Sequence, residues 1–350
     1  MRVLVATDAW RPQINGVVRT YERLTEELSR LGADMAFLTP SQFATLPLPS
    51  YPEIRLAILS EGSVRDFYKQ HQPDFIHIAT EGPIGFRTRR WCLRHGHPFT
   101  TSYHTRFPDY ISARLPVPQS WGYALQRWFH NAGAGTMVAT PSMAASLKSK
   151  GFRRLLPWTR GVDTDLFRPR VRSLAAPTEP VFLYVGRVAV EKGIETFLNL
   201  DLPGSKVVVG DGPLLEPLRR SYPNVRFTGP KFDDQLAAEY AAADVFVFPS
   251  RTDTFGIVLL EAMASGLPVA AFPVTGPIDV VRNGETGILD DNLGRAAMMA
   301  LDLDREAVRR HAMSYSWSAC ARMFVDNIVA ANLDAGHRPV SRPAALALGS

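Results

Sequence analysis

Two acidic residues in the segment 250–271 flank the start of a predicted helix, and their spacing suits a sugar nucleotide. Asp253 lies just before this helix and Glu261 about two turns inside it. At 1.5 Å rise per residue the two carboxylates stand roughly 10 Å apart, which can bracket a diphosphate between a sugar and a ribose. Carboxylates accept hydrogen bonds from vicinal hydroxyls. The free N–H groups at the helix start, near Phe255 and Gly256, suit the diphosphate itself.

The plainer interpretation of these acids is a helix N-terminal carboxylate and a solvated glutamate. Glu261, however, lies inside the apolar run 257–263, where an unpaired carboxylate is costly.

Two cations follow a predicted strand at 181–185. Arg187 and Lys192 stand around a turn at the carboxyl end of this strand, where a guanidinium fork and an ammonium can neutralise a diphosphate leaving group. The Gly-Asp-Gly turn at 210–212 lets backbone approach a ligand, although this signal alone is weak. Taken singly, each cation is more often an ordinary surface charge.

The N-terminal half places polar residues after predicted strands in a similar way. Asn15 and Gly16 follow the apolar strand 3–7 and begin an amphipathic helix, and a glycine there permits close backbone approach. His104 follows the β-type run 99–103. The ordinary explanations are a tight turn and a structural histidine.

Basic and aromatic residues alternate at helical spacing in the segments 86–99 and 118–133. Arginines at an interface meet anionic lipid while aromatic rings seat at headgroups, so the pattern favours a peripheral membrane surface. A core-facing aromatic stripe with a solvated charged face is the alternative, and no motif that reads nucleic acid is present. The residues that carry the membrane hypothesis are Arg87, Arg89, Arg90, Arg94 and Trp128.

Both halves of the chain alternate short apolar strands with helical periodicity, which predicts an α/β fold of two doubly wound domains with parallel sheets. The segment 160–180 breaks this rhythm and is predicted to be the linker. We expect an N-terminal domain over 1–168 and a second domain over 169–315, with a helix at about 316–335 packing back on the first. Ligands of such sheets bind outside the carboxyl ends of the strands.

The composition excludes several other classes. The 350 residues include 46% hydrophobic and 21% charged residues, which argues against wholesale disorder. The two cysteines lie far apart and support neither a disulfide scaffold nor a cysteine zinc site. No apolar run reaches the roughly 18 residues of a membrane span, and we expect a cytoplasmic protein. The net charge of +5 divides into +9 for residues 1–170 and −4 for 171–350, which points to different partners for the two halves.

Several motifs in one order resemble the nucleotide-sugar glycosyltransferases of family 4, which have the GT-B fold. The resemblance covers roughly residues 1–330 and is strongest to members that glycosylate lipids, of the sulfoquinovosyl-diacylglycerol synthase and mannosyltransferase types. The segments that carry it are 12–21, 80–85, 102–110, 139–143, 161–163, 186–193, 209–213, 243–250 and 253–269.

The resemblance implies roles for individual residues. The family's two acids fall on Asp253, shortened here from the usual Glu, which would reach the donor sugar, and on Glu261, which would hold the ribose. Arg187 and Lys192 would bind the diphosphate. The remaining donor positions are Asn15, Gly16, Lys231 near the base, His104 at the donor sugar, and the backbone amides of Thr254, Phe255 and Gly256. Arg106 stands where many relatives have Asp or Asn, and it adds positive charge near the acceptor.

The resemblance also implies a reaction. We expect a retaining transfer of a hexose or hexuronic acid from a UDP-sugar to a membrane lipid, with diacylglycerol as the leading acceptor, at the inner face of the cell membrane. The alternatives are a GDP-mannose-dependent mannosyltransferase acting on a phosphatidylinositol-type lipid or a polysaccharide, a nucleotide-sugar 2-epimerase, and a non-catalytic nucleotide-binding module. No cofactor or metal is expected, because the cation pair serves the diphosphate. The Asp-x-Asp sequences at 163–165 and 302–304 lie in a predicted turn and a charged helix.

Overall fold

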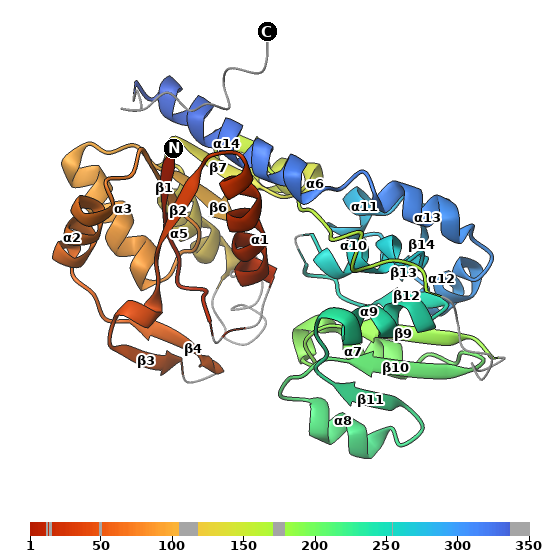
Figure 1. The fold of residues 1–350 in the computed structure, drawn as a ribbon. Helices are drawn as coiled ribbons and strands as arrows, with labels where there is room; N and C mark the ends of the chain where they lie inside the picture. The colour runs from red at the N-terminus through yellow and green to blue at the C-terminus, as the bar shows by residue number, and fades with distance from the viewer. Residues whose placement is uncertain are drawn as a thin grey trace, which may run out of the picture. The chain divides into compact units, whose positions relative to one another are not determined.

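The computed structural model describes residues 1–11, 13, 16–48, 51–104, 118–170, 179–253 and 255–336. The chain divides into two compact units (Figure 1). The first comprises Met1–Thr159 and the segment from Trp317 onward, and the second comprises Arg160–Ser316. The boundary therefore lies at Thr159, nine residues before the predicted one.

The first unit is built on a six-stranded parallel sheet of order β2-β1-β5-β6-β7-β8. Its inner strands β5, β6 and β7 are buried along their whole length, as expected for a doubly wound sheet. Val3 and Val5 of β1 point to one core cluster, and Leu4 and Ala6 point to another on the opposite face. The strand bounds are β1 Arg2–Ala6, β2 Asp34–Leu38, β5 Phe75–Ile78, β6 Thr100–Tyr103, β7 Gly135–Val138 and β8 Leu155–Pro157.

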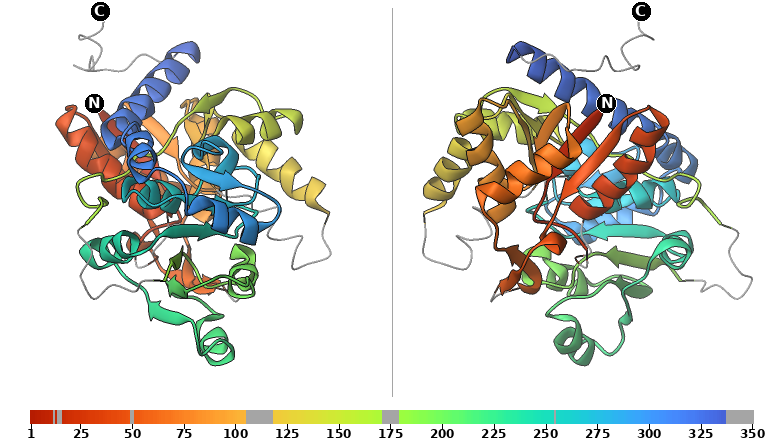
Figure 2. Two further views of the ribbon diagram at one scale, coloured as in Figure 1. Left: turned by 90° about the vertical axis from the view of Figure 1, so that its right-hand side faces the viewer. Right: turned by 60° about the vertical axis from the view of Figure 1, so that its left-hand side comes forward.

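Helices cover both faces of this sheet. The helices α1 (Gly16–Arg30) and α14 (Trp317–Asp334) lie side by side on one face, as the views in Figures 1 and 2 agree. The opposite face is covered by α2 (Glu61–His71), α3 (Pro83–His95) and α5 (Gln119–His130), and α6 (Pro141–Ser149) follows β7. The C-terminal helix α14 thus completes the N-terminal core, in which its Phe324 and Ile328 are fully buried.

The second unit repeats this plan with the parallel order β11-β10-β9-β12-β13-β14. Strand β9 lies in the middle, between β10 and β12, so the segments that follow these three strands emerge together at one edge. The strands are β9 Val181–Val185, β10 Ser205–Val209, β11 Arg226–Gly229, β12 Val245–Phe248, β13 Val269–Ala271 and β14 Gly287–Leu289. The helices are α7 Ile194–Leu198, α8 Leu215–Ser221, α9 Asp233–Ala242, α10 Ile257–Ala264, α11 Pro277–Val280, α12 Leu293–Ala300 and α13 Arg305–Ala312.

Two features differ from the sequence-based expectation. An antiparallel hairpin, β3 (Thr45–Leu48) with β4 (Tyr51–Ala57), extends the first unit and was not predicted. The described part of the predicted linker, 160–170, is not a free connection, because it packs on the second unit. There the Arg309 guanidinium donates to the carbonyl of Phe167, and the Val162 N–H donates to the carbonyl of Tyr315.

Candidate functional site

The predicted cation and acid of the second unit meet at the carboxyl edge of its sheet. Lys192 follows β9 and Asp253 follows β12, and the two strands are neighbours in the sheet. The Lys192 ammonium donates to Asp253 Oδ1 at 2.5 Å. The other carboxylate oxygen, Oδ2, is buried and has no hydrogen-bond partner among the described residues. A buried acceptor without a donor is costly, so Oδ2 is a place where a ligand hydroxyl would be stabilised.

Glycines let the segments around this pair approach one another at backbone distance. A Cβ on Gly210 would lie 1.9 Å from the carbonyl oxygen of Gly186, and one on Gly212 would lie 2.4 Å from that of Val188. Gly193, with φ +64°, would place a Cβ 2.8 Å from the Pro249 oxygen. Only glycine permits this packing, so the weak Gly-Asp-Gly signal at 210–212 reflects a tight contact between the segments after β9 and β10.

Tyr184, the penultimate residue of β9, fixes the backbone of Arg187. Its hydroxyl donates to the Arg187 carbonyl at 2.7 Å. Burial raises the pKa of the Tyr184 hydroxyl well above its ordinary value, and the negative charges of Asp253 and Glu191 add to this shift. Tyr184 therefore remains a neutral donor, and Arg187 is anchored by its backbone while its side chain is half-buried at the edge.

Glu261 lies inside α10 with only 4% of its surface exposed. The Tyr240 hydroxyl of α9 donates to Glu261 Oε2 at 2.9 Å, which supplies the partner that the apolar surroundings demand. Gly256, with φ +82°, precedes the first turn of α10, and no side chain of a described residue caps that turn. Phe255 is buried, and Thr254 lies outside the described residues. The ribose role of Glu261 and the amide roles at 254–256 stay predictions.

Lys231 follows β11 and so lies at the same carboxyl edge, separated from β9 by the intervening β10. Its side chain is half-buried. This position is consistent with contact to a more distant part of a nucleotide, and that contact remains a prediction.

In the first unit, His104 directly follows β6 and contacts a buried polar chain. His104 Nε2 lies 3.4 Å from the hydroxyl of Tyr21, which lies 2.9 Å from Nε2 of His77. His77 Nδ1 in turn lies 2.8 Å from the Thr100 hydroxyl. Gly16 begins α1, the helix that carries Tyr21. The structure therefore connects the first helix and His104 through Tyr21, whereas Asn15 lies outside the described residues.

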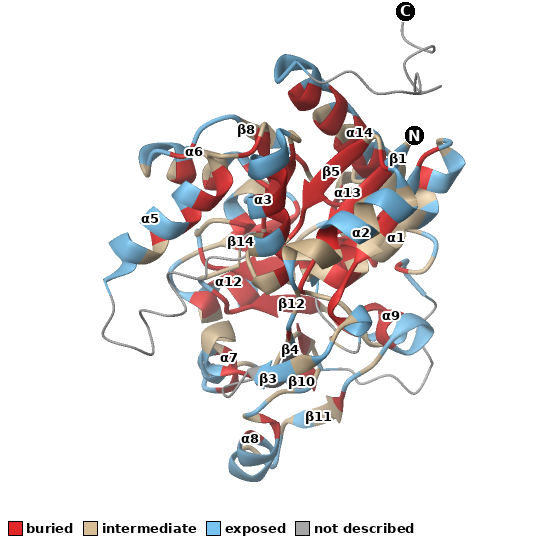
Figure 3. Ribbon diagram, turned by 90° about the vertical axis from the view of Figure 1, so that its left-hand side faces the viewer, coloured by how far each residue is buried: buried red, intermediate tan, exposed pale blue. Residues whose placement is uncertain are grey.

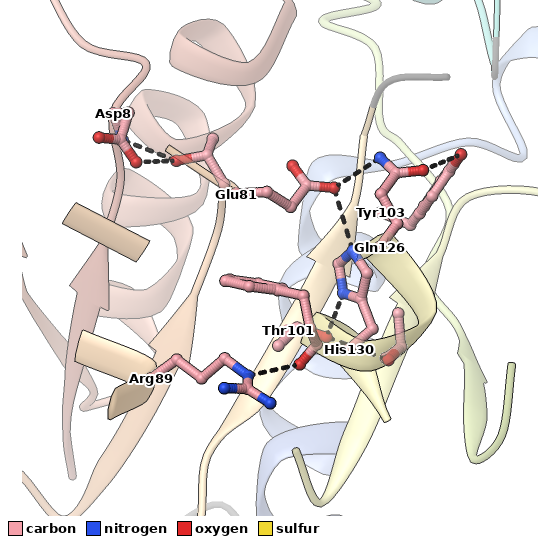
Figure 4. A network of polar contacts seen from close by, with 10 residues as sticks. Asp8, Glu81, Arg89, Thr101, Tyr103, Gln126 and His130 are labelled. Atoms are coloured by element: carbon pink, nitrogen blue, oxygen red, sulfur yellow. Dashed lines mark hydrogen bonds and ion pairs between the residues drawn. The ribbon is translucent and has the colours of Figure 1, made fainter. Parts of the chain in front are cut away.

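A second polar network at this edge was missed by the motif reasoning (Figure 4). Glu81 Oε1 lies 3.0 Å from His130 Nε2 and accepts a hydrogen bond from Gln126 Nε2 at 3.2 Å. Gln126 also accepts a hydrogen bond from the Tyr103 hydroxyl. The only sequence signal was that Glu81 lies in the segment 80–85, which contributes to the family resemblance. The partners come from α5, more than forty residues away.

Asp8 anchors the start of α3 in the same region. Its carboxylate accepts hydrogen bonds from the backbone N–H groups of Ile84 and Gly85 and from the Thr80 hydroxyl. Burial raises the pKa of Asp8 to about 6, against these hydrogen bonds, which act to lower it. A Cβ on Gly82 would lie 2.3 Å from the Asp8 carboxyl carbon, so this turn requires glycine.

The arginines that were grouped as a membrane surface are not equivalent. Arg89 is buried, which corrects its assignment. Its guanidinium donates to the carbonyls of Phe129 and Trp128 at the end of α5 and stacks on the Trp128 ring at 3.6 Å. Arg90 and Arg94 are exposed and form ion pairs with Glu61, whereas Arg87 is exposed and forms no ion pair with a described residue. Arg106 lies outside the described residues.

The aromatic residues of α5 divide between its two faces, which Figure 3 colours as buried and exposed. Tyr123 and Phe129 are buried, so the core interpretation holds for them. Trp121, Leu125 and Trp128 are 71%, 54% and 54% exposed, and their spacing places them on one stripe. Large apolar side chains exposed in a row are typical of an interaction surface.

Comparison with known proteins identifies the enzyme class. A family model described as Glycosyltransferase Family 4 matches residues 14–166, and one described as Glycosyl transferases group 1 matches residues 179–301. Similar proteins include the sulfoquinovosyl transferase SQD2 of Arabidopsis thaliana, 28% identical over 87% of this chain and 69% of its own. A GDP-mannose-dependent alpha-mannosyltransferase of Mycobacterium tuberculosis is 29% identical over 83% of each chain. This chain is a glycosyltransferase of the GT-B fold.

The fold of this glycosyltransferase is also seen in solved structures. Sucrose-phosphate synthase from Thermosynechococcus elongatus aligns with a TM-score of 0.75 over 96% of this chain and 99% of that one, at 24% identity. HepE from Anabaena, in complex with UDP-glucose, aligns with a TM-score of 0.71 at 15% identity, over 94% of this chain and 100% of its own. These two structures confirm the expected fold class. At such low identity they say nothing about the substrates of this chain.

Three further observations concern membrane spans, metal sites and the first Asp-x-Asp sequence. Among the described residues there is no helix with the length and apolarity to span a bilayer. Within the same residues no three His, Cys, Asp or Glu side chains gather as a metal site. Asp163, in the first Asp-x-Asp sequence, accepts hydrogen bonds from the backbone N–H groups of Asp165 and Leu166, a local turn contact.

Proposed function

We propose that this glycosyltransferase transfers a hexose or hexuronic acid from a UDP-sugar to diacylglycerol at the inner face of the cell membrane. The observation that carries the proposal is that the chain has both a cation-lined carboxyl edge, in the second unit, and an apolar stripe on α5, in the first unit. The cation-lined edge suits a sugar diphosphate, and the apolar stripe suits a lipid surface.

The donor would bind at the edge formed by the segments after β9, β10 and β12. Lys192 and Arg187 would neutralise the diphosphate, together with the backbone amides that begin α10. The free oxygen of Asp253 would accept a hydrogen bond from a hydroxyl of the transferred sugar. The bond from the sugar to the diphosphate breaks as the acceptor oxygen attacks. The acceptor attacks on the face from which the diphosphate leaves, so the anomeric configuration is retained. The cations stabilise the leaving charge, and the departing diphosphate takes up the hydroxyl proton. No metal or cofactor takes part in this scheme.

The acceptor would come from the membrane side of the first unit. Trp121, Leu125 and Trp128 would insert at the headgroup level, and Arg87 with Arg94 would meet anionic lipid from a surface pocket beside the start of α2. The +9 charge of residues 1–170 supports an anionic surface. Among the similar proteins, an alpha-monoglucosyldiacylglycerol synthase of Streptococcus pneumoniae is 27% identical over 77% of this chain and 71% of its own.

The test uses purified protein, diacylglycerol vesicles and a panel of UDP- and GDP-sugars, with products identified by mass spectrometry. We expect one glycosylated diacylglycerol that forms only with a UDP-sugar. If no lipid product forms with any donor, the proposal is wrong.

A second candidate is transfer of mannose from GDP-mannose to a phosphatidylinositol-type lipid or a polysaccharide. It is favoured by the names of several similar mannosyltransferases, including the 29% identical protein of Mycolicibacterium smegmatis, which covers 91% of this chain and 94% of its own. Thermal shift separates the two candidates, because the preferred donor nucleotide should raise the melting temperature and the other should not.

A further inference from the structure

The two oxygens of the Glu81 carboxylate have different surroundings. Oε1 is held by Gln126 Nε2 and His130 Nε2, at 3.2 and 3.0 Å. Oε2 makes no hydrogen bond to a described residue and is not among the fully enclosed polar atoms. Figure 4 shows it pointing away from His130 and Gln126. The Glu81 side chain is only 10% exposed, so nearly all of it is enclosed by the protein.

The partners of Glu81 are themselves immobilised. His130 is fully enclosed, and its Nδ1 lies 2.8 Å from the Thr101 hydroxyl, which donates to Thr136. Gln126 is buried and accepts from the Tyr103 hydroxyl at 3.1 Å. Since both contacts on Oε1 come from ordered side chains, Oε2 is oriented in advance and can accept a hydrogen bond without loss of rotamer freedom.

Glu81 also stands at the edge where a substrate is expected. In the parallel register Ile78 of β5 is opposite Thr101 of β6. Glu81 and His104 each lie three residues beyond this pair along their own chain segments, so both emerge at the carboxyl edge of the first sheet. Most of the donor-binding features described above belong to the second unit, and Gly16 and His104, which the resemblance assigns to the donor, are the described exceptions in the first. The rest of this edge is therefore left for the other substrate.

The helix that holds Glu81 is the one with the exposed apolar stripe. Gln126 and His130 lie on the buried face of α5, while Trp121, Leu125 and Trp128 lie on its exposed face. A lipid that binds the exposed face of α5 therefore lies on the same helix whose buried face holds the Glu81 carboxylate.

We propose that Glu81 Oε2 accepts a hydrogen bond from a hydroxyl group of the acceptor. This inference rests on the proposed function and deepens it. An ionised carboxylate accepts hydrogen bonds and repels phosphate, so Glu81 selects a neutral, hydroxyl-bearing lipid. In diacylglycerol, which has one hydroxyl, the hydrogen bond to Glu81 orients the attacking hydroxyl in the bound state, and its proton leaves Glu81 for the diphosphate as the new bond forms. In a glycosylated diacylglycerol the bound hydroxyl can belong to the sugar.

The deciding variant is Glu81→Gln. A glutamine can keep its oxygen at the Oε1 position for Gln126 and His130 and replace only Oε2 by an N–H donor. We expect kcat/KM for the acceptor to fall at least tenfold, in line with the loss of a hydrogen bond to a charged group. The KM for the nucleotide sugar and the melting temperature should stay near wild-type values. With either acceptor the loss should appear mainly in the KM for the acceptor, because the hydrogen bond forms when the acceptor binds.

The matched control is Glu239→Gln, which neutralises another mostly enclosed glutamate, paired with Arg226 in the second unit. It should leave acceptor kinetics unchanged. If kcat/KM of the Glu81→Gln enzyme for the acceptor is within twofold of the wild-type value, the inference is wrong and the proposed function is unaffected.

Calorimetric binding of dioctanoylglycerol tests the inference about Glu81 without depending on turnover. At least fivefold weaker binding by Glu81→Gln than by wild type supports the inference. Equal binding, or none by either protein, overturns it. An inactive wild type contradicts the proposed function alone.

Discussion

The ammonium of Lys192 lies 2.5 Å from Oδ1 of Asp253, although the two residues are 61 positions apart in the chain. Each comes from a segment that follows a central strand of the second sheet, and each holds the other at the carboxyl edge. The pair leaves one buried carboxylate oxygen, Asp253 Oδ2, without a partner among the described residues. A cation and an acid poised in this way can serve the diphosphate and the sugar of one ligand.

Replacing Lys192 by Ala should strongly impair catalysis. In the proposed donor site it removes positive charge where the leaving diphosphate would develop negative charge, and such losses are worth about 100-fold or more in kcat. Steady-state kinetics with the preferred donor measure the effect. Arg219→Ala, which breaks an exposed ion pair with Glu216, is the control and should have no effect on kcat. Full activity in the Lys192 variant would contradict the donor-site assignment.

Replacing Tyr240 by Phe should destabilise the second unit. The change removes the hydroxyl that donates to the buried Glu261, at an expected cost of about 1–3 kcal/mol in the free energy of unfolding. Urea denaturation measures this cost. Tyr222→Phe is matched, because the Tyr222 hydroxyl donates to Asn199 at an exposed position, and its cost should be smaller. Equal effects of the two variants would show that the Glu261 contact is unimportant for stability.

The titration of Asp8 should make stability depend on pH. Its folded pKa is about 6, above the ordinary 3.8, so the folded state binds the proton more tightly than the unfolded state. The free energy of unfolding should therefore fall by about 3 kcal/mol from this group as pH rises from about 4 to 6, and stay level above that.

Asp8→Asn is the test of this titration, because asparagine does not ionise there. The unfolding free energy of the variant minus that of wild type should rise over the same pH interval. Parallel stability curves would refute the shifted pKa.

Removing the apolar stripe of α5 should weaken membrane binding without unfolding the protein. Trp121→Ala with Leu125→Ala deletes two exposed side chains, and the affinity for anionic vesicles should fall roughly tenfold. Vesicle co-sedimentation measures the change. Met313→Ala, at a similarly exposed position at the end of α13, should leave binding intact. Unchanged binding by the double variant would exclude α5 as the membrane surface.

The periodic elements could be predicted from the sequence because their local patterns agree with the fold. The run 181–185 is strand β9 at the predicted bounds, and the start of α10 lies where the segment 250–271 placed it. The hairpin β3–β4 was missed because its strands contain prolines and lie outside the alternation of strands and helices.

The remaining errors arise from tertiary contacts. Helical spacing alone could not show that Arg89 faces inward, because that depends on which face of α3 meets α5. Residues 160–170 have the composition of a linker, yet the distant Arg309 fixes them to the second unit. The Glu81 network needed partners from α5, which no motif signals. Local pattern therefore identified Lys192 and Asp253 as candidates, but only the fold showed that they touch.

The return of α14 to the first sheet has a consequence for biosynthesis. Trp158 Nε1 donates to the Cys320 carbonyl, and Asn327 donates to the Pro157 carbonyl, so the first core needs residues made after the whole second unit. The second unit is one uninterrupted stretch, whereas the first is assembled from two ends of the chain. On the ribosome the second unit can therefore close while the first still lacks a helix, and a nascent chain halted before Trp317 would expose the apolar surface that Phe324 and Ile328 later cover.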